Sequence, residues 1–137
     1  MSLPTFYPHE CRKATLSSAQ QNCVRVGRKA GWTILWDDKL TPTIDIAHPL
    51  PADQILVFTD AEFDEVQTAL RKGISLRSAR HALRVHEQPD GLVEFTAASD
   101  NHQPEPGVRL RFDEKEVSAF LDGVRRKEFD REQFGTV

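Results

Sequence analysis

Cysteine and long apolar stretches are both scarce in this sequence. Its two cysteines, Cys11 and Cys23, are too few for a disulfide scaffold and lack the C-x-x-C spacing of redox and zinc motifs, although one bond between them is an alternative. No apolar run approaches the roughly 18–20 residues that a membrane-spanning helix needs. Residues 1–13 lack the apolar core of a secretory signal. We therefore expect a cytoplasmic protein without a membrane partner.

The sequence also lacks the short motifs of the common enzyme classes. It contains no G-x-S-x-G nucleophile elbow, no H-E-x-x-H zinc motif, no P-loop and no dinucleotide-binding glycine fingerprint. Asp37 and Asp38, together with Glu10 or His48, could form an acid–base or metal-binding group. Paired carboxylates at the end of a strand are, however, more typical of a solvated turn. We therefore predict a protein that is not an enzyme and has no catalytic residues.

Zinc is the metal for which the sequence offers the most ligands. His9, Cys11 and Cys23 carry the imidazole and thiol groups that suit zinc. A fourth ligand at a recognisable spacing is missing, and Cys23 in an apolar strand is more typical of a small buried side chain. The sequence therefore predicts neither a metal nor another cofactor.

Positive and negative charges nearly balance, because the net charge is −3. This value argues against a general attraction to nucleic acid or to anionic lipid. The distribution is uneven, since residues 71–86 contain five Arg or Lys residues, two histidines and no carboxylate. This basic segment could contact phosphates or an acidic partner surface. An ordinary solvated linker explains it equally well.

The first half of the chain shows a hairpin, a further strand and a helix. Alternating valines and a run of β-branched and aromatic residues indicate the strands. The expected strands cover residues 23–26, 32–36 and 55–58, with a short edge strand at 43–46 in a proline-rich connection. Thr59 and Glu62 have the spacing of a capping box, so a helix begins there, and Lys72 and Gly73 end it.

The second half repeats this order. The expected strands cover residues 83–85, 92–95 and 108–112, with a turn at 89–91. In the last strand, Arg109 and Arg111 share one face, and the apolar residues between and beside them share the other. Asp113 and Glu116 form a second helix cap. An apolar stripe follows, made of Val117, Phe120, Leu121 and Val124.

The two halves correspond when Phe58 is aligned with Phe112. The helices are then offset by 54 residues and the hairpins by about 59–60. We interpret this as an internal duplication, because the order, the spacing and the caps of the elements all agree. Each unit alone buries too little apolar surface to be stable in water, so the two units should pack on each other. We expect an α+β fold in which two tandem antiparallel-sheet-plus-helix repeats pack as one pseudo-twofold globular domain. The expected parts of the single unit 1–137 are repeat one (about 13–73), repeat two (about 83–129), an irregular N-terminal arm (1–12) and a charged C-terminal tail (130–137). Phe129 and Phe134, at the end of the chain, could dock on the body or on a partner.

An ordered set of motifs resembles the actinobacterial domain-of-unknown-function family 397. The motifs are Ser17-Ser18, Asn22-Cys23-Val24 with Val26, Trp36-Asp37-Asp38-Lys39, Leu56-Val57-Phe58-Thr59 and Ala61-Glu62-Phe63. They cover about residues 13–73, and residues 83–129 look like a degenerate further copy. The chain departs from the family pattern at four points. The opening Trp is absent from residues 12–16, Trp36 stands in place of Arg, Asp38 in place of Ser and Phe63 in place of Trp.

The resemblance implies a mode of action. Members of that family are small proteins commonly encoded beside helix-turn-helix regulators of the Xre type, and some belong to toxin–antitoxin-like pairs. It therefore implies a non-catalytic regulatory protein that binds such a regulator. The alternative is a module that binds single-stranded nucleic acid through sheet aromatics and the basic segment. A homodimer is a further arrangement that the sequence leaves open.

Seven residues are the candidates for contact with a partner. Trp32 and Trp36 lie four residues apart on one strand face, where they form part of the core if buried and a docking platform if exposed. The full candidate set is Trp32, Trp36, Asp37, Lys39, Arg77, Arg80 and Arg84.

Overall fold

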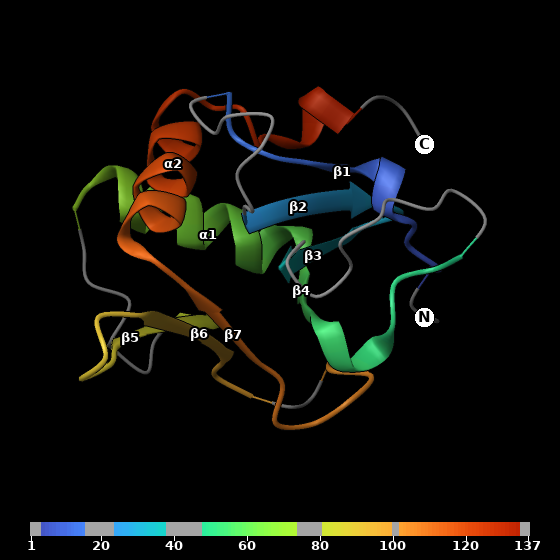
Figure 1. The fold of residues 1–137 in the computed structure, drawn as a ribbon. Coiled ribbons are helices and arrows are strands. Elements are labelled where there is room, and N and C mark those ends of the chain that lie inside the picture. The colour runs from blue at the N-terminus through green and yellow to red at the C-terminus, as the bar shows by residue number, and fades with distance from the viewer. Residues whose placement is uncertain (1–3, 16–23, 38–47, 74–80, 100–101, 135–137) are drawn as a thin grey trace.

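The computed structural model describes residues 4–15, 24–37, 48–73, 81–99 and 102–134. The fold is α+β, with two antiparallel sheets and two helices (Figure 1). The first sheet has the strand order β1 (Cys11–Arg12), β2 (Val24–Lys29), β3 (Trp32–Asp37) and β4 (Ile55–Thr59). The second has the order β5 (Leu83–Glu87), β6 (Val93–Ala97) and β7 (Arg109–Phe112). Helix α1 (Asp60–Arg71) follows β4, helix α2 (Glu114–Arg125) follows β7, and short 3-10 turns lie at η1 (Pro8–Glu10), η3 (Ala52–Gln54) and η4 (Arg131–Phe134).

Both helices begin at the predicted capping boxes. The amide of Glu62 donates to the Thr59 hydroxyl oxygen at 3.1 Å, and the Thr59 amide donates to the Glu62 carboxylate at 2.8 Å. Asp113 and Glu116 make the same reciprocal pair at 2.8 and 3.0 Å. Each box satisfies two backbone groups that would otherwise lack partners at a helix start. The two predicted helix starts are therefore confirmed.

The hairpin β2–β3 is closed by a two-residue turn. Lys29 pairs with Trp32, so Ala30 and Gly31 form the turn, with φ angles of 54° and 87°. A two-residue turn of this type needs positive φ at both positions, because its twist then matches that of the strands. Glycine adopts this conformation freely, whereas alanine does so at a cost.

The strand pairing in the two sheets follows one scheme. Val26 pairs with Leu35 in the first sheet, as Val85 pairs with Phe95 in the second. Leu35 pairs in turn with Leu56, as Phe95 pairs with Leu110. The offsets between corresponding residues are those expected from the sequence, 54 for the helices and 59–60 for the hairpins. This agreement is compatible with a duplication, which stays a prediction.

One hydrophobic core joins the two sheets and both helices. The two helices contact each other, and the inner faces of both sheets pack against them (Figure 1). Each half of the chain contributes fully buried side chains to it, such as Phe58, Phe63, Phe95 and Phe112. Phe95 lies 5.0 Å from Phe112 and 5.8 Å from Phe120 between ring centroids, in edge-on contacts. The expectation of a shared interior is met in the described residues.

The first sheet is also buried on its outer face, which the sequence did not predict. Ile34, Trp36, Ile55 and Val57 form a second apolar cluster with Phe6, Cys11 and Leu50. The arm expected to be irregular carries strand β1, in which Cys11 pairs with Gly27. The Leu50 amide donates to the Phe6 carbonyl at 2.8 Å and so ties the two covering segments together. The predicted edge strand at residues 43–46 lies outside the described residues.

The C-terminal segment packs on the body. Phe129 is fully buried, with its ring 5.5 Å from that of Phe120. A side chain at Gly123 would bring its Cβ to 2.7 Å from the Phe129 ring, so the close approach requires glycine there. Glu128 accepts hydrogen bonds from the amide and hydroxyl of Thr15. Slight burial opposes its ionisation, but these bonds prevail and lower the pKa of Glu128.

Candidate functional site: the basic face of the second sheet

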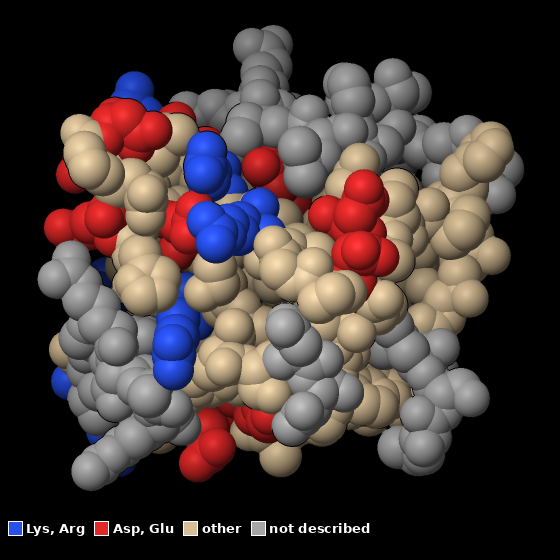
Figure 2. All heavy atoms as spheres, turned by 90° about the horizontal axis from the view of Figure 1, so that it is seen from below, with Lys and Arg blue, Asp and Glu red and all other residues tan. Residues whose placement is uncertain are grey.

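The outer face of the second sheet carries polar side chains on all three strands. In β5, β6 and β7, alternate residues such as Leu83, Phe95 and Leu110 point into the core. The side chains between them form the opposite face, which we call the basic sheet face: Arg84, His86, Glu94, Thr96, Arg109 and Arg111. Seen from below, basic side chains gather on the side of the molecule where this sheet lies, with acidic side chains beside them (Figure 2).

Two rows of residues cross this face from strand to strand. In one row, His86 pairs with Glu94, and Glu94 pairs with Arg111. In the other row, Arg84 pairs with Thr96, and Thr96 pairs with Arg109. Because directly opposite residues in antiparallel strands have Cβ atoms about 4.5–5.5 Å apart, each row forms one contiguous strip of side chains.

The charges of the two rows are satisfied differently. Glu94 is buried, and its carboxylate lies 3.3 Å from Nε of Arg111, whose side chain is 56% exposed. Among the described residues, Arg84 and Arg109 form no hydrogen bond or ion pair, and Nε of Arg84 is buried without a partner. The Arg84–Thr96–Arg109 row therefore carries two positive charges that nothing in the described part of the chain neutralises.

A small cavity of about 210 Å³ lies near the start of α1. His81, His102, Glu62 and Gln103 line it with apolar residues of β4 and β6. The Gln103 amide accepts from the Val57 amide at 2.9 Å and donates to the Val57 carbonyl at 2.7 Å, so it occupies the edge of β4. His102 lies 3.6 Å from Glu62, whose carboxylate is already engaged in the helix cap. The described residues contain no group of three or more metal-ligating side chains.

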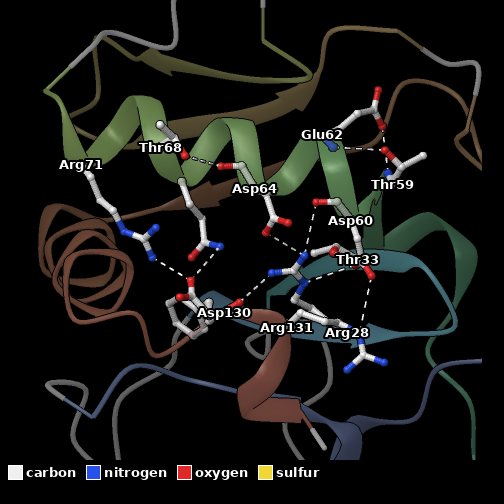
Figure 3. A network of polar contacts seen from close by, with 12 residues as sticks. Arg28, Thr33, Thr59, Asp60, Glu62, Asp64, Thr68, Arg71, Asp130 and Arg131 are labelled. Carbon is white, nitrogen blue, oxygen red and sulfur yellow. Dashed lines mark hydrogen bonds and ion pairs between the residues drawn. The ribbon is translucent and has the colours of Figure 1, made fainter. Parts of the chain in front are cut away.

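A buried arginine links the start of α1 to the C-terminal segment (Figure 3). The side chain of Arg28 is fully buried, and its Nη2 lies 2.9 Å from a carboxylate oxygen of Asp64. Its Nε lies 3.3 Å from Asp60, its Nη1 donates to the Phe129 carbonyl at 3.0 Å, and its guanidinium lies 5.1 Å from the Phe63 ring centroid. This pairing compensates the buried charge, which is a structural task.

Asp60 is shared by several further partners in this network. The Thr33 hydroxyl donates to it at 2.7 Å, and Nε of Arg131 lies 3.5 Å from its second oxygen. Arg71 and Asp130 form a parallel link at 2.8 Å, so α1 is tied to the C-terminal segment at two points (Figure 3). The carboxylates of Asp60, Asp64 and Asp130 are thus paired with arginines.

The structure corrects the predicted partner-binding role of two residues. Trp36 is fully buried and Asp37 is 3% exposed, so neither is accessible to a partner. For Trp36 the reason is the cover over the outer face of the first sheet, which turns that face into core. Asp37 points to the opposite face of β3, where it pairs with the buried Val24. Trp32 is half-buried at the edge of this cluster, with its ring centroid 5.4 Å from that of His102. Of the two readings considered for the tryptophans, the core reading is therefore correct for Trp36.

Four candidates remain, and only one of them lies within the described residues. Lys39, Arg77 and Arg80 lie outside the described residues. Arg84 lies on the basic sheet face, where it is partly exposed. The residues that join it there were not among the candidates, although the alternation in 108–112 had placed Arg109 and Arg111 on one face.

The described residues do not assemble the metal-binding or acid–base groups that the sequence suggested. Glu10 pairs with Lys29 at 2.7 Å, and Asp38 lies outside the described residues. Cys11 is a free thiol, and burial, together with the nearby Glu10 charge, raises its pKa to about 12. A thiol that resists ionisation is a poor nucleophile and a poor zinc ligand. Cys23 also lies outside the described residues.

Comparisons of the chain with protein-family models, with curated proteins and with solved structures gave no match. The resemblance to the actinobacterial family, and the partner that it implies, therefore stay predictions. Neither helix described here has the length and apolarity needed to cross a bilayer.

Proposed function

We propose that this protein is a non-catalytic regulatory protein that binds a partner protein through the basic sheet face. The observation that supports this proposal is the contrast between the two sheets. The first sheet is covered on both faces, whereas the second presents an open face with Arg109 and Arg111 exposed. The family resemblance adds the class of partner, an Xre-type helix-turn-helix regulator, in what would be a toxin–antitoxin-like or developmental pair.

An arginine-bearing sheet face suits protein recognition. Arginine is enriched in interfaces, because its planar group makes several directed hydrogen bonds. A strand framework also holds the arginines at fixed spacing, which lowers the entropy lost on binding. The positive potential would speed association with an acidic surface and make the rate sensitive to salt.

The charge of the face indicates how it would meet a regulator. The surface with which a helix-turn-helix protein contacts DNA is basic, because it contacts phosphates. Like charges facing each other disfavour docking of the basic sheet face there. We therefore expect this protein to bind an acidic surface of the regulator and to leave its DNA-contacting helix free.

The alternative of binding single-stranded nucleic acid has less support. Stacking of bases needs exposed aromatic side chains. In the described residues of β5–β7, the aromatic rings of Phe95 and Phe112 lie in the core, and Trp36 is buried in the first sheet. The arginines alone could contact phosphates, so this reading is kept as an outcome of the test.

Co-purification with a regulator tests the proposal. The chain is expressed with the helix-turn-helix regulator of its gene neighbourhood, and we expect the two to co-elute in size exclusion at micromolar concentration. The variant Arg84→Glu/Arg109→Glu should weaken binding by about a hundredfold, or roughly tenfold for each reversed charge. The matched control Lys72→Glu/Lys115→Glu reverses two exposed cations elsewhere and should change affinity less than about threefold.

Two results would count against the proposal. Separate elution of the wild-type chain and the regulator would refute the partner class. Equal weakening by the control variant would show that overall charge, and not this face, governs binding. In a gel-shift assay, we expect the regulator–DNA band to move to a larger complex; release of the DNA would contradict the expected docking side.

A further inference from the structure

We propose that the Arg84–Thr96–Arg109 row is an oxyanion-binding site that takes the carboxylate of an acidic side chain of the partner protein. This inference rests on the proposed function, because it assigns the chemistry of that docking face. The row differs from its neighbour in composition and charge, and both differences indicate the same kind of ligand.

The register places the three side chains as an anion site requires. Arg84 on β5 and Arg109 on β7 flank Thr96 on the central strand β6. Neighbouring strands lie about 4.7–4.9 Å apart, so the two arginine backbones are separated by about twice that distance. Arginine side chains are long enough to converge from both sides on a group above the threonine. That group would meet two guanidinium forks and one hydroxyl donor, all in a single row.

The neighbouring row shows why the site is confined to one strip. Glu94 already supplies a carboxylate to Arg111 at 3.3 Å. The Glu94–Arg111 pair thus displays, within the chain, the interaction that the Arg84–Thr96–Arg109 row lacks. In the Arg84–Thr96–Arg109 row the central residue is a neutral threonine instead of a carboxylate, so the negative group has to come from outside.

The state of Arg84 points to a ligand as well. Within the described part of the chain, its Nε is buried and has no hydrogen-bond partner, while the residue as a whole is partly exposed. Most buried polar groups are satisfied by a partner. Because Arg84 and Arg109 belong to one row, an oxyanion bound there would offset the charge of both.

A carboxylate fits this row better than the backbone of a nucleic acid. Nucleic-acid grooves present a line of phosphates and need a line of cations. Here the cations are interrupted, because Glu94 lies directly beside the row on β6. A single carboxylate between two arginines avoids this repulsion.

Nuclear magnetic resonance titration of the full chain tests this site with defined probes. We use a hexaglutamate peptide, a hexaglutamine peptide as its uncharged counterpart, and a thymidine hexanucleotide. We expect hexaglutamate to shift the backbone amides of residues 84, 96 and 109 in a saturable manner. Hexaglutamine should leave them in place, and the hexanucleotide should bind more weakly than hexaglutamate.

Single substitutions separate a built site from a diffuse charge effect. Arg84→Gln or Arg109→Gln should weaken hexaglutamate binding about tenfold, and Arg84→Lys should restore only part of the loss, because lysine keeps the charge without the fork. Thr96→Val preserves the β-branched shape and should weaken binding severalfold. The control Lys72→Gln/Lys115→Gln should stay within about twofold of wild type. Unchanged amide spectra away from the row confirm that each variant is folded.

The outcomes distinguish this site from the proposed function. Equal affinity of wild type and the row variants, or no saturable shift, would overturn the site even if a regulator co-elutes. Tighter binding of the hexanucleotide would assign the row to phosphates and overturn the carboxylate. Saturable hexaglutamate binding without co-elution of a regulator would keep the site and refute only the partner class.

Discussion

The outer faces of the two sheets carry opposite chemistry at matching positions. In the first sheet, the positions in β3 and β4 are Ile34, Trp36, Ile55 and Val57; at the corresponding register in β6 and β7 they are Glu94, Thr96, Arg109 and Arg111. The strand pairing is the same, but segments containing Phe6 and Leu50 cover the first face. The comparison shows that the covering segments, and not the sheets, decide whether an outer face is core or surface.

The largest difference should appear on truncating the central residue of each face. Trp36→Ala removes a fully buried ring and should lower the free energy of unfolding by about 3–5 kcal/mol. Thr96→Ala, at the matching position, should change it by less than about 1 kcal/mol. Urea denaturation followed by circular dichroism measures both. Similar losses in the two variants would show that the second face is covered as well.

The pH dependence of stability should sharpen the contrast. Burial of Cys11 under the covered face, with a smaller contribution from Glu10, raises its pKa from 9.0 to about 12. Above pH 9 the thiol ionises in the unfolded chain but stays protonated in the folded protein, so the free energy of unfolding should fall by about 1.4 kcal/mol per pH unit between pH 9 and 12. This contribution is fully present below pH 9.

A variant without the thiol is the control for this pH dependence. Cys11→Ala should show a flatter profile over the same interval, because it lacks the buried thiol. The measurement is urea denaturation at pH 8, 9, 10 and 11. Parallel profiles of the two proteins would mean that the thiol is accessible to water.

A smaller effect is expected at the close contact beneath the arm. A Cβ on Gly27 would lie 2.9 Å from Sγ of Cys11 and 3.2 Å from the Phe6 ring. Gly27→Ala should therefore cost about 1–3 kcal/mol by overpacking. His86→Ala, at the matching position of the open face, should be nearly neutral. Thermal unfolding compares the two variants. A stabilised Gly27→Ala protein would indicate that the arm moves to make room for the methyl group at no cost in stability.

The smallest effect concerns the ion pair of the open face. Arg111→Gln removes the partner of Glu94, but the arginine side chain is 56% exposed and its charge is well screened. We expect a loss below about 1 kcal/mol at low salt and less at high salt. The double variant Glu94→Gln/Arg111→Gln should recover most of it. A loss of several kcal/mol would mean that Arg111 is the main compensation for the buried Glu94 carboxylate.

Local signals predicted the regular elements well. Thr59, Glu62, Asp113 and Glu116 lie within four residues of one another in each pair, so the capping boxes depend on neighbouring residues alone. Strand alternation likewise separated the inner from the outer side chains of β7. The order of strands and helices in both halves followed from these signals.

The candidate site was only partly predictable. Arg84 was identified from a run of basic residues, but Arg109 reaches the same row from a strand on the far side of β6. No short-range pattern reports which strands pair or in which register. Trp36 shows the reverse error, because it was named as a partner-binding candidate although a core position was favoured, and a distant arm covers it.

Arg28 illustrates the same limit inside the molecule. It stands close to a hairpin turn, yet its side chain is fully buried against Asp60, Asp64 and the Phe129 carbonyl. The chain segments that neutralise it lie 32 to 101 residues away. Folding brings all of these partners to the guanidinium, and together they compensate the cost of burying its charge.

By itself, the sequence determined the secondary structure, the inward and outward sides of the strands, and the repeated order of the two halves, because these depend on periodicity and on contacts within one turn. The tertiary structure alone decided which sheet face became core, where the buried arginine found its carboxylates, and which arginines came to share a row. Those outcomes depend on contacts between residues far apart in the chain, and burial is a property of what covers a side chain as much as of the side chain itself.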